Sequence, residues 1–250
     1  GKDALLVDFS KQNIDEASLQ LLIGVAEQAG VEQLRNSMFH GAVINGTENQ
    51  PALHTALRAP LGTSVNVNGV DVMKEVHRVR TLVNEFAESV RSGNIAGATG
   101  KRFQSVINVG IGGSDLGPTL VHEALSSSIT PAVRAHFVSN IDPIDVRAVL
   151  RECDPETTFV VLCSKSFSTA ETLSNGRIIA QWISDAVGAR NVSKHFAVVS
   201  VFPEKAASAG LLADYAFPMW SWVGGRYSIS SAVNLVNVIA FGSNAYDNML

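Results

Sequence analysis

Two segments in the first hundred residues place apolar residues three and four positions apart. They are residues 14–29 and 74–91, and this spacing puts the apolar side chains on one face of an α-helix. Between them, residues 41–59 combine a turn-rich stretch with a short helical pattern that starts near Pro51. We therefore expect residues 1–100 to form a mainly helical amino-terminal arm that wraps around the rest of the protein without a second core.

The pattern changes near residue 105 to short apolar runs rich in β-branched residues. Continuous apolar strands are typical of a parallel sheet that is covered on both faces. The segments between the runs have the length of crossover helices. This pattern predicts a doubly wound, three-layer α/β domain over residues 101–250, with a mainly parallel five-stranded sheet. The expected strands begin near residues 105, 135, 158 and 196, with a weaker one near 214. The expected helices are roughly residues 118–125, 143–151, 170–187 and 203–209.

Composition and charge narrow the classes of function. The chain is 46% hydrophobic and 17% charged, which is typical of a soluble globular protein. Its formal charge of −4 and the absence of a basic stripe argue against a nucleic-acid partner. No apolar run approaches the ~18 residues of a membrane helix, so we expect no membrane partner. Two cysteines, Cys153 and Cys163, are too few for a disulfide framework, and we expect a cytoplasmic protein.

The first loop that could carry chemistry is glycine-rich and covers residues 110–118. Its glycines would let backbone N–H groups approach an anion at the start of a helix, as in a phosphate site. The dinucleotide fingerprint is incomplete, because Asp115 stands where a third small residue is needed. The nucleotide P-loop is also excluded, because no Lys-Ser/Thr pair follows Gly117. A tight strand-to-helix turn that simply needs glycine is the alternative.

The second loop, residues 164–169, concentrates hydroxyl groups at the start of a predicted helix. Hydroxyl donors and free helix N–H groups can together bind a phosphate dianion. The alternative is a capping box, because Ser168 and Glu171 have the required spacing. Capping does not account for the remaining hydroxyl residues, Ser164, Ser166 and Thr169. We expect Lys165 to contribute to the loop through its backbone.

The third feature is the Gly224-Gly225-Arg226 sequence. The glycines permit close approach to a ligand, and the guanidinium could stabilise developing negative charge on oxygen. A structural ion pair between Arg226 and a carboxylate is the alternative. The six histidines show no paired metal spacing, and no Gly-x-Ser-x-Gly motif is present. We therefore expect no metal and no cofactor, and either proton transfer or simple binding as the function.

In order along the chain, these loops resemble the glucose-6-phosphate isomerase family. The resemblance rests on residues 44–58, 108–118, 136–142, 163–172 and 223–228. It covers essentially the whole chain, and the sheet region resembles the sugar-isomerase (SIS) fold. The family implies interconversion of glucose 6-phosphate and fructose 6-phosphate through ring opening and a cis-enediolate, in glycolysis and gluconeogenesis. It also implies a homodimeric full-length protein.

The resemblance assigns roles to particular residues. Gly113, Ser114 and Gly225 would contact the substrate, and Arg226 would stabilise the cis-enediolate. Glu171 would be the acidic residue that supports the site. The loop that holds the 6-phosphate would consist of Ser164, Lys165, Ser166, Phe167, Ser168 and Thr169.

The chain departs from the family pattern at several positions. Ala170 stands where Gln is usual, and Asn234 stands where Gly is common. Gln50 and Pro51 replace a more usual Arg-Ala, and Ser221 replaces an acidic residue. These departures concern sugar-side contacts and local packing more than the hydroxyls of the phosphate loop.

The family's catalytic Glu base, its ring-opening His and a late Lys belong to a carboxyl-terminal half that these 250 residues do not include. We therefore expect an amino-terminal portion of an isomerase that is inactive by itself. The alternative is a non-catalytic phosphosugar-binding SIS module. Such modules normally accompany a DNA-binding domain and lack Gly-Gly-Arg, which favours the isomerase. A dinucleotide or nucleotide-sugar enzyme is disfavoured because neither glycine fingerprint is complete.

Overall fold

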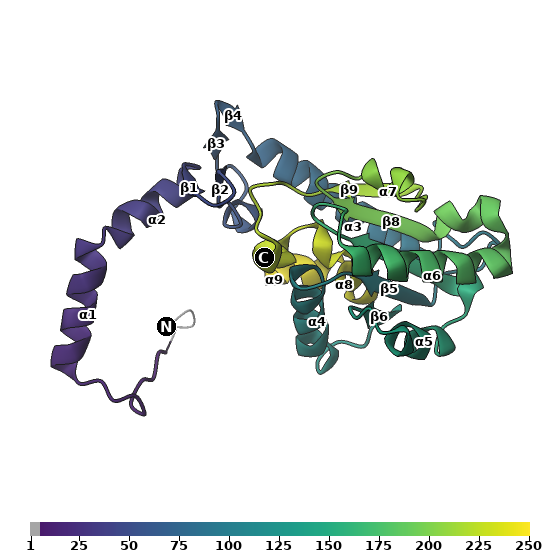
Figure 1. Cartoon of the computed structure of the whole chain (residues 1–250), viewed down its shortest axis with the longest axis horizontal. Coiled ribbons are helices and arrows are strands. Elements are labelled where there is room, and N and C mark those ends of the chain that lie inside the picture. Colours follow the sequence, from purple (N-terminus) through teal and green to yellow (C-terminus); the bar gives the residue numbers. More distant parts are fainter. Residues whose placement is uncertain (1–5) are drawn as a thin grey trace.

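The computed structural model describes residues 6–250, which form an α/β body and an arm that leads away from it (Figure 1). The body contains one sheet in which every neighbouring pair of strands is parallel. The strand order is β6-β5-β7-β8-β9. The five strands are β5 (Ser105–Val109), β6 (Arg134–Val138), β7 (Thr158–Cys163), β8 (Phe196–Ser200) and β9 (Tyr215–Pro218). All five predicted strands are therefore confirmed, including the weak one.

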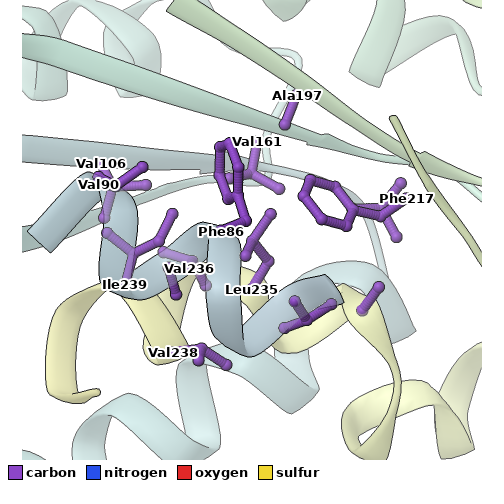
Figure 2. Close-up of a cluster of buried hydrophobic side chains, with 14 of the residues drawn as sticks. Phe86, Val90, Val106, Val161, Ala197, Phe217, Leu235, Val236, Val238 and Ile239 are labelled. Carbon is purple, nitrogen blue, oxygen red and sulfur yellow. The ribbon is translucent and has the colours of Figure 1, made fainter. Parts of the chain in front are cut away.

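Helices cover both faces of this sheet, which is why its central strands β5, β7 and β8 are mainly apolar and buried along their whole length. On one face lie α3 (Met73–Ser92) and α8 (Leu235–Phe241), and on the other lie α5 (Pro143–Arg151) and α6 (Ala170–Val187). Figure 2 shows Phe86 of α3 and Leu235 of α8 packed against the strand that carries Val161. The predicted three-layer, doubly wound α/β fold is confirmed.

The local sequence explains where helix α5 begins. Asp142 caps α5, because its carboxylate accepts a hydrogen bond from the Ile144 N–H (2.9 Å), and Pro143 occupies the first helical position. Helices α5 and α6 have the predicted bounds. The other helices of the body are α4 (Gly113–Ser126), α7 (Lys205–Ser208) and α9 (Ser243–Met249), with 3₁₀ turns at Pro155–Thr157, Ala189–His195, Gly225–Ser230 and Ala232–Asn234.

Helix α4 begins at Gly113, earlier than the predicted start at Pro118. Pro118 therefore lies inside the helix, where it cannot donate a hydrogen bond to the Ser114 carbonyl four residues before it. The side chain of Asn108, which is fully buried in β5, donates to that carbonyl instead (3.0 Å). This substitute donor allows the glycine loop itself to form the first turn of the helix.

The arm begins with α1 (Glu16–Gln28) and α2 (Val31–Phe39), neither of which contains a buried residue. The helix predicted at 14–29 is confirmed, whereas α2 was not predicted. Two short hairpins follow, β1 (Val43–Asn45) with β2 (Gln50–Pro51) and β3 (Asn66–Val67) with β4 (Val70–Asp71), and a 3₁₀ turn lies between them at Ala56–Arg58.

Besides the apolar clusters on the two faces of the sheet, a third apolar cluster joins the arm to the body. In it, Leu53 and Leu57 of the arm pack with Val76 of α3 and with Trp222 and Val223. Helix α3, predicted at 74–91, belongs to the first hundred residues and yet packs on the sheet. The division of the chain near residue 100 stays a prediction. Within residues 6–250, no helix combines the length and the apolar character that a membrane crossing requires.

Candidate active site

The candidate site lies where the direction of the sheet's strand order reverses. From β5 the chain continues to β6 on one side, and it then returns to β7 on the other side of β5. In open α/β sheets, a ligand crevice forms at such a switch point, outside the carboxyl ends of the strands. The glycine loop follows β5 and the hydroxyl loop follows β7. Both loops predicted from the sequence therefore flank the switch point.

The glycine loop and the Gly-Gly-Arg turn touch through their backbones. A Cβ atom at Gly113 would lie only 2.6 Å from the Arg226 nitrogen and even closer to the Gly225 carbonyl. The Ser228 hydroxyl donates to the Gly225 carbonyl (2.7 Å) and reaches the Gly113 carbonyl at 3.5 Å. The structure thus brings three predicted site residues together, and it explains why only glycine fits at position 113.

The hydroxyl loop has a strained backbone at its centre. Phe167 has a φ of 51°, a left-handed conformation that is rare for a bulky residue, and its side chain is only 4% exposed. The ring belongs to the apolar cluster that includes Ile179 and Ile183 of α6, and its burial there anchors the loop. On either side of Phe167, the Ser166 and Ser168 hydroxyl oxygens approach to 2.7 Å. The strain therefore turns two hydroxyls toward each other at the start of α6.

The capping box is not formed. Helix α6 begins at Ala170, and its N-cap residue, Thr169, makes no side-chain capping hydrogen bond. The Ser168 hydroxyl pairs with Ser166, while Thr169 lies 3.5 Å from the hydroxyl of the buried Ser164. The first N–H groups of α6 therefore face the loop without a side-chain acceptor from the N-cap residue. Glu171 lies half-buried in the first turn of α6.

Lys165 contributes through its side chain as well as its backbone. Its carbonyl accepts hydrogen bonds from the Val201 N–H (3.1 Å) and the Ser200 hydroxyl (3.2 Å), which fix the loop to the end of β8. Its ammonium nitrogen lies 3.2 Å from a carboxylate oxygen of Glu48 in the arm. The backbone contribution was predicted, and the ion pair with Glu48 was not.

Arg226 is exposed, and within residues 6–250 its guanidinium has no carboxylate at ion-pair distance. The alternative interpretation, a structural ion pair between Arg226 and a carboxylate, is therefore not found among the described residues. The guanidinium carbon lies 5.5 Å from the centre of the neighbouring Tyr227 ring, within the range of a cation–π contact.

The arm adds contacts to the site that the sequence analysis missed. The Leu53 N–H donates to the Trp222 carbonyl (3.1 Å), and the His54 ring stacks on Tyr227 with centroids 4.6 Å apart. His54 and other arm residues line a cavity of about 300 Å³ together with Gly224, Arg226 and Tyr227. The family resemblance of residues 44–58 was the only signal for these contacts, and it carried no role for His54.

Two departures from the family pattern meet in this region. The Ser221 hydroxyl donates to the side-chain carbonyl of Gln50 (3.1 Å). The usual family residues at these positions are Arg and an acid, which could form an ion pair. Here a neutral hydrogen bond links the same two segments, so the two replacements are compatible with each other.

Burial shifts the pKa of two groups near the site. Desolvation lowers the pKa of His54, and the positive charge of Arg58 lowers it further. Desolvation also raises the pKa of Asp115 in the first turn of α4, although hydrogen bonds from Ser139 and Thr119 oppose the shift. Within residues 6–250, no group of three or more His, Cys, Asp or Glu side chains is arranged to hold a metal ion.

Comparisons with known proteins agree with this geometry. The family model described as phosphoglucose isomerase matches residues 8–250. Glucose-6-phosphate isomerase 4 of Rhodococcus jostii and the glucose-6-phosphate isomerase of Mycobacterium tuberculosis H37Rv are each 43% identical over 246 residues. Each alignment covers 98% of this chain and 44% of the relative, so the chain spans less than half the length of these curated relatives.

Solved structures give the same result. The crystal structure of a glucose-6-phosphate isomerase from Chlamydia trachomatis matches with a TM-score of 0.80 and 31% identity, over 94% of this chain and 44% of that one. A hypothetical protein from Thermus thermophilus, 23% identical with a TM-score of 0.62 over 93% of this chain and 47% of that one, shares the fold. The match to the family model over almost the whole chain, together with the identity to these relatives, shows that the chain belongs to the phosphoglucose isomerase family.

Proposed function

We propose that this chain supplies the phosphate grip and the Gly-Gly-Arg turn of a glucose-6-phosphate isomerase. The whole protein would interconvert glucose 6-phosphate and fructose 6-phosphate through ring opening and a cis-enediolate. One observation carries the proposal: the glycine loop and the hydroxyl loop flank the switch point, and the backbone contact between Gly113 and Gly225 joins Arg226 to them.

The hydroxyl loop would hold the 6-phosphate. Hydroxyl donors and the free N–H groups at the start of α6 suit a dianion, because the helix N-terminus carries partial positive charge. Lys165 adds a positive charge, which Glu48 offsets in part. The backbone strain at Phe167 supports this assignment, since strained non-glycine residues cluster at ligand-binding sites. Ser114, in the first turn of α4, would contact the sugar.

Arg226 would act on the other end of the substrate. Its guanidinium has no acidic partner within residues 6–250 and is free to approach the oxygens that become charged in the enediolate. Donors that are held in place at such a position are often the largest single contribution to the rate. Glu171 would support the phosphate loop from the first turn of α6.

We propose that the catalytic base lies outside these 250 residues, in the half of the relatives that this chain does not cover. A positioned base contributes about 10²–10⁴-fold to a rate. The chain by itself should therefore bind sugar phosphates and turn them over poorly. The resemblance also implies a cytoplasmic homodimer for the whole protein, which we include in the proposal.

Isothermal titration of the chain with fructose 6-phosphate and with 5-phosphoarabinonate, a mimic of the enediolate, tests the phosphate grip. We expect both ligands to bind, and we expect a Ser166→Ala, Thr169→Ala double variant to lose both. The matched control removes the exposed hydroxyl pair of Ser127 and Ser128, which lie 3.4 Å apart beyond α4. If the folded chain binds neither ligand, or if the double variant binds as well as the wild type, the proposed phosphate grip is wrong.

A coupled assay of isomerase activity then separates the isomerase from the non-catalytic alternative. The whole protein should interconvert the two hexose phosphates at a rate that falls when Arg226 is replaced with alanine. Ligand binding without any turnover by the whole protein would favour the non-catalytic binding module.

A further inference from the structure

We propose that His54 of the arm is a positioning residue for Arg226, acting through the ring of Tyr227. This inference rests on the proposed function, because Arg226 is the group that would stabilise the enediolate. It goes beyond that function by assigning part of the site's geometry to the arm.

The first step concerns the freedom of Arg226. Its side chain is exposed, it has no ion pair within residues 6–250, and its described contact is with the Tyr227 ring at 5.5 Å. A long side chain of this kind samples many rotamers in solution. Effective catalysis requires a geometry within about 0.5 Å of the productive one. The Tyr227 ring is therefore the surface that restricts Arg226.

The second step concerns Tyr227. Its side chain is 50% exposed, so burial alone does not fix its ring. The His54 ring lies nearly parallel to it, with an interplanar angle of 21° and centroids 4.6 Å apart. A stacked pair at this distance restricts the ring's orientation beyond what burial provides.

The third step concerns the support of His54. The preceding residue, Leu53, is fully buried in the third apolar cluster, and its N–H donates to the Trp222 carbonyl. Gln50 and Ser221 form a second hydrogen bond between the same two segments. The backbone of His54 is thus fixed to the chain just before the Gly-Gly-Arg turn, and the arm and the turn form one unit.

The electrostatics agree with a stacking role. Burial and the charge of Arg58 lower the pKa of His54, which favours the neutral imidazole. A neutral ring stacks on Tyr227 without placing a second positive charge beside Arg226. His54, Tyr227, Arg226 and Glu48 also line the same cavity of about 300 Å³.

The test compares two ligands and three variants of the chain. Binding of 5-phosphoarabinonate should depend on Arg226, whereas binding of inorganic phosphate should depend on the hydroxyl loop. We expect His54→Ala to weaken the binding of 5-phosphoarabinonate by about two- to tenfold, the range of an aromatic pair's coupling, and to change phosphate binding less than twofold. His54→Phe, which keeps a ring, should restore most of the affinity. The control, His40→Ala, removes an exposed histidine of the arm that does not stack.

Side-chain relaxation of the Arg226 Nε–H group, measured by NMR without ligand, gives a readout that does not depend on the proposed function. We expect this group to become more mobile in His54→Ala, and to behave as in the wild type in His54→Phe and His40→Ala. If the wild type binds neither ligand, the proposed function fails, and the relaxation data still test the positioning role. Unchanged Arg226 mobility in a folded His54→Ala variant, or an equal loss of affinity for both ligands, would overturn the inference.

Discussion

Replacing Gly113 with alanine should misplace Arg226. The added Cβ atom would lie closest to the Gly225 carbonyl and 2.6 Å from the Arg226 nitrogen, whereas ordinary contacts start at 3.4 Å. The Arg226 contact by itself requires a separation of 0.8 Å (3.4 − 2.6), so the two backbones must move apart by more than that. A misplacement of about 1 Å can cost on the order of 10²-fold. We therefore expect Gly113→Ala to weaken the binding of 5-phosphoarabinonate by roughly 10- to 100-fold. Overpacking of this kind should also lower the free energy of unfolding by about 1–3 kcal/mol.

Gly224→Ala is the matched control for this prediction. Gly224 lies in the same turn, has φ and ψ of −63° and 140° that alanine adopts readily, and its added Cβ would meet Tyr227 at an ordinary 3.6 Å. Isothermal titration with 5-phosphoarabinonate should give a near wild-type affinity for Gly224→Ala and a weaker affinity for Gly113→Ala. The reasoning is refuted if Gly113→Ala binds like the wild type, or if both variants lose affinity equally.

Two further predictions concern stability. Burial lowers the pKa of three histidines, His54, His136 and His195. In the unfolded chain these histidines have their ordinary pKa, so they bind protons at a higher pH than in the folded chain. Protonation therefore favours the unfolded state, and the free energy of unfolding should fall as the pH drops below about 6.5. Urea unfolding at pH 7.5 and 5.0 should show a smaller fall for His195→Gln, and equal falls would contradict this account. Separately, Asn108→Ala should cost about 1–3 kcal/mol, because the Ser114 carbonyl loses its donor. Adding Pro118→Ala supplies a backbone N–H that can donate to the Ser114 carbonyl, so the double variant should recover part of the lost free energy of unfolding in the same assay. If the double variant is instead less stable by the sum of the two single losses, this explanation is wrong.

The sequence predicted the sheet well because strand formation here depends on local pattern. Each strand of the body is a short run rich in apolar residues, and α5 and α6 begin after recognisable turn residues. Helix α4 was predicted to start too late, since Pro118 normally marks a helix start. Its true start depends on Asn108, which lies in a different element and satisfies the Ser114 carbonyl.

The loops of the candidate site could be proposed from the sequence, whereas the contacts that support them could not. The hydroxyls and glycines are adjacent in sequence, so local composition marked them as candidates and the family resemblance assigned their roles. The contacts of Glu48 with Lys165 and of His54 with Tyr227 join residues far apart in the chain, and no local pattern encodes them. The need for glycine at position 113 likewise depends on the position of Gly225.

Two of the links between the arm and the site should respond differently to ionic strength. The hydrogen bond between Gln50 and Ser221 joins neutral groups, so dissolved salt does not screen it. The pair of Lys165 and Glu48 joins partly exposed charges, which mobile ions screen, with a Debye length of about 8 Å at physiological ionic strength. Rising salt would therefore loosen the arm from the phosphate loop while leaving it attached to the Gly-Gly-Arg turn.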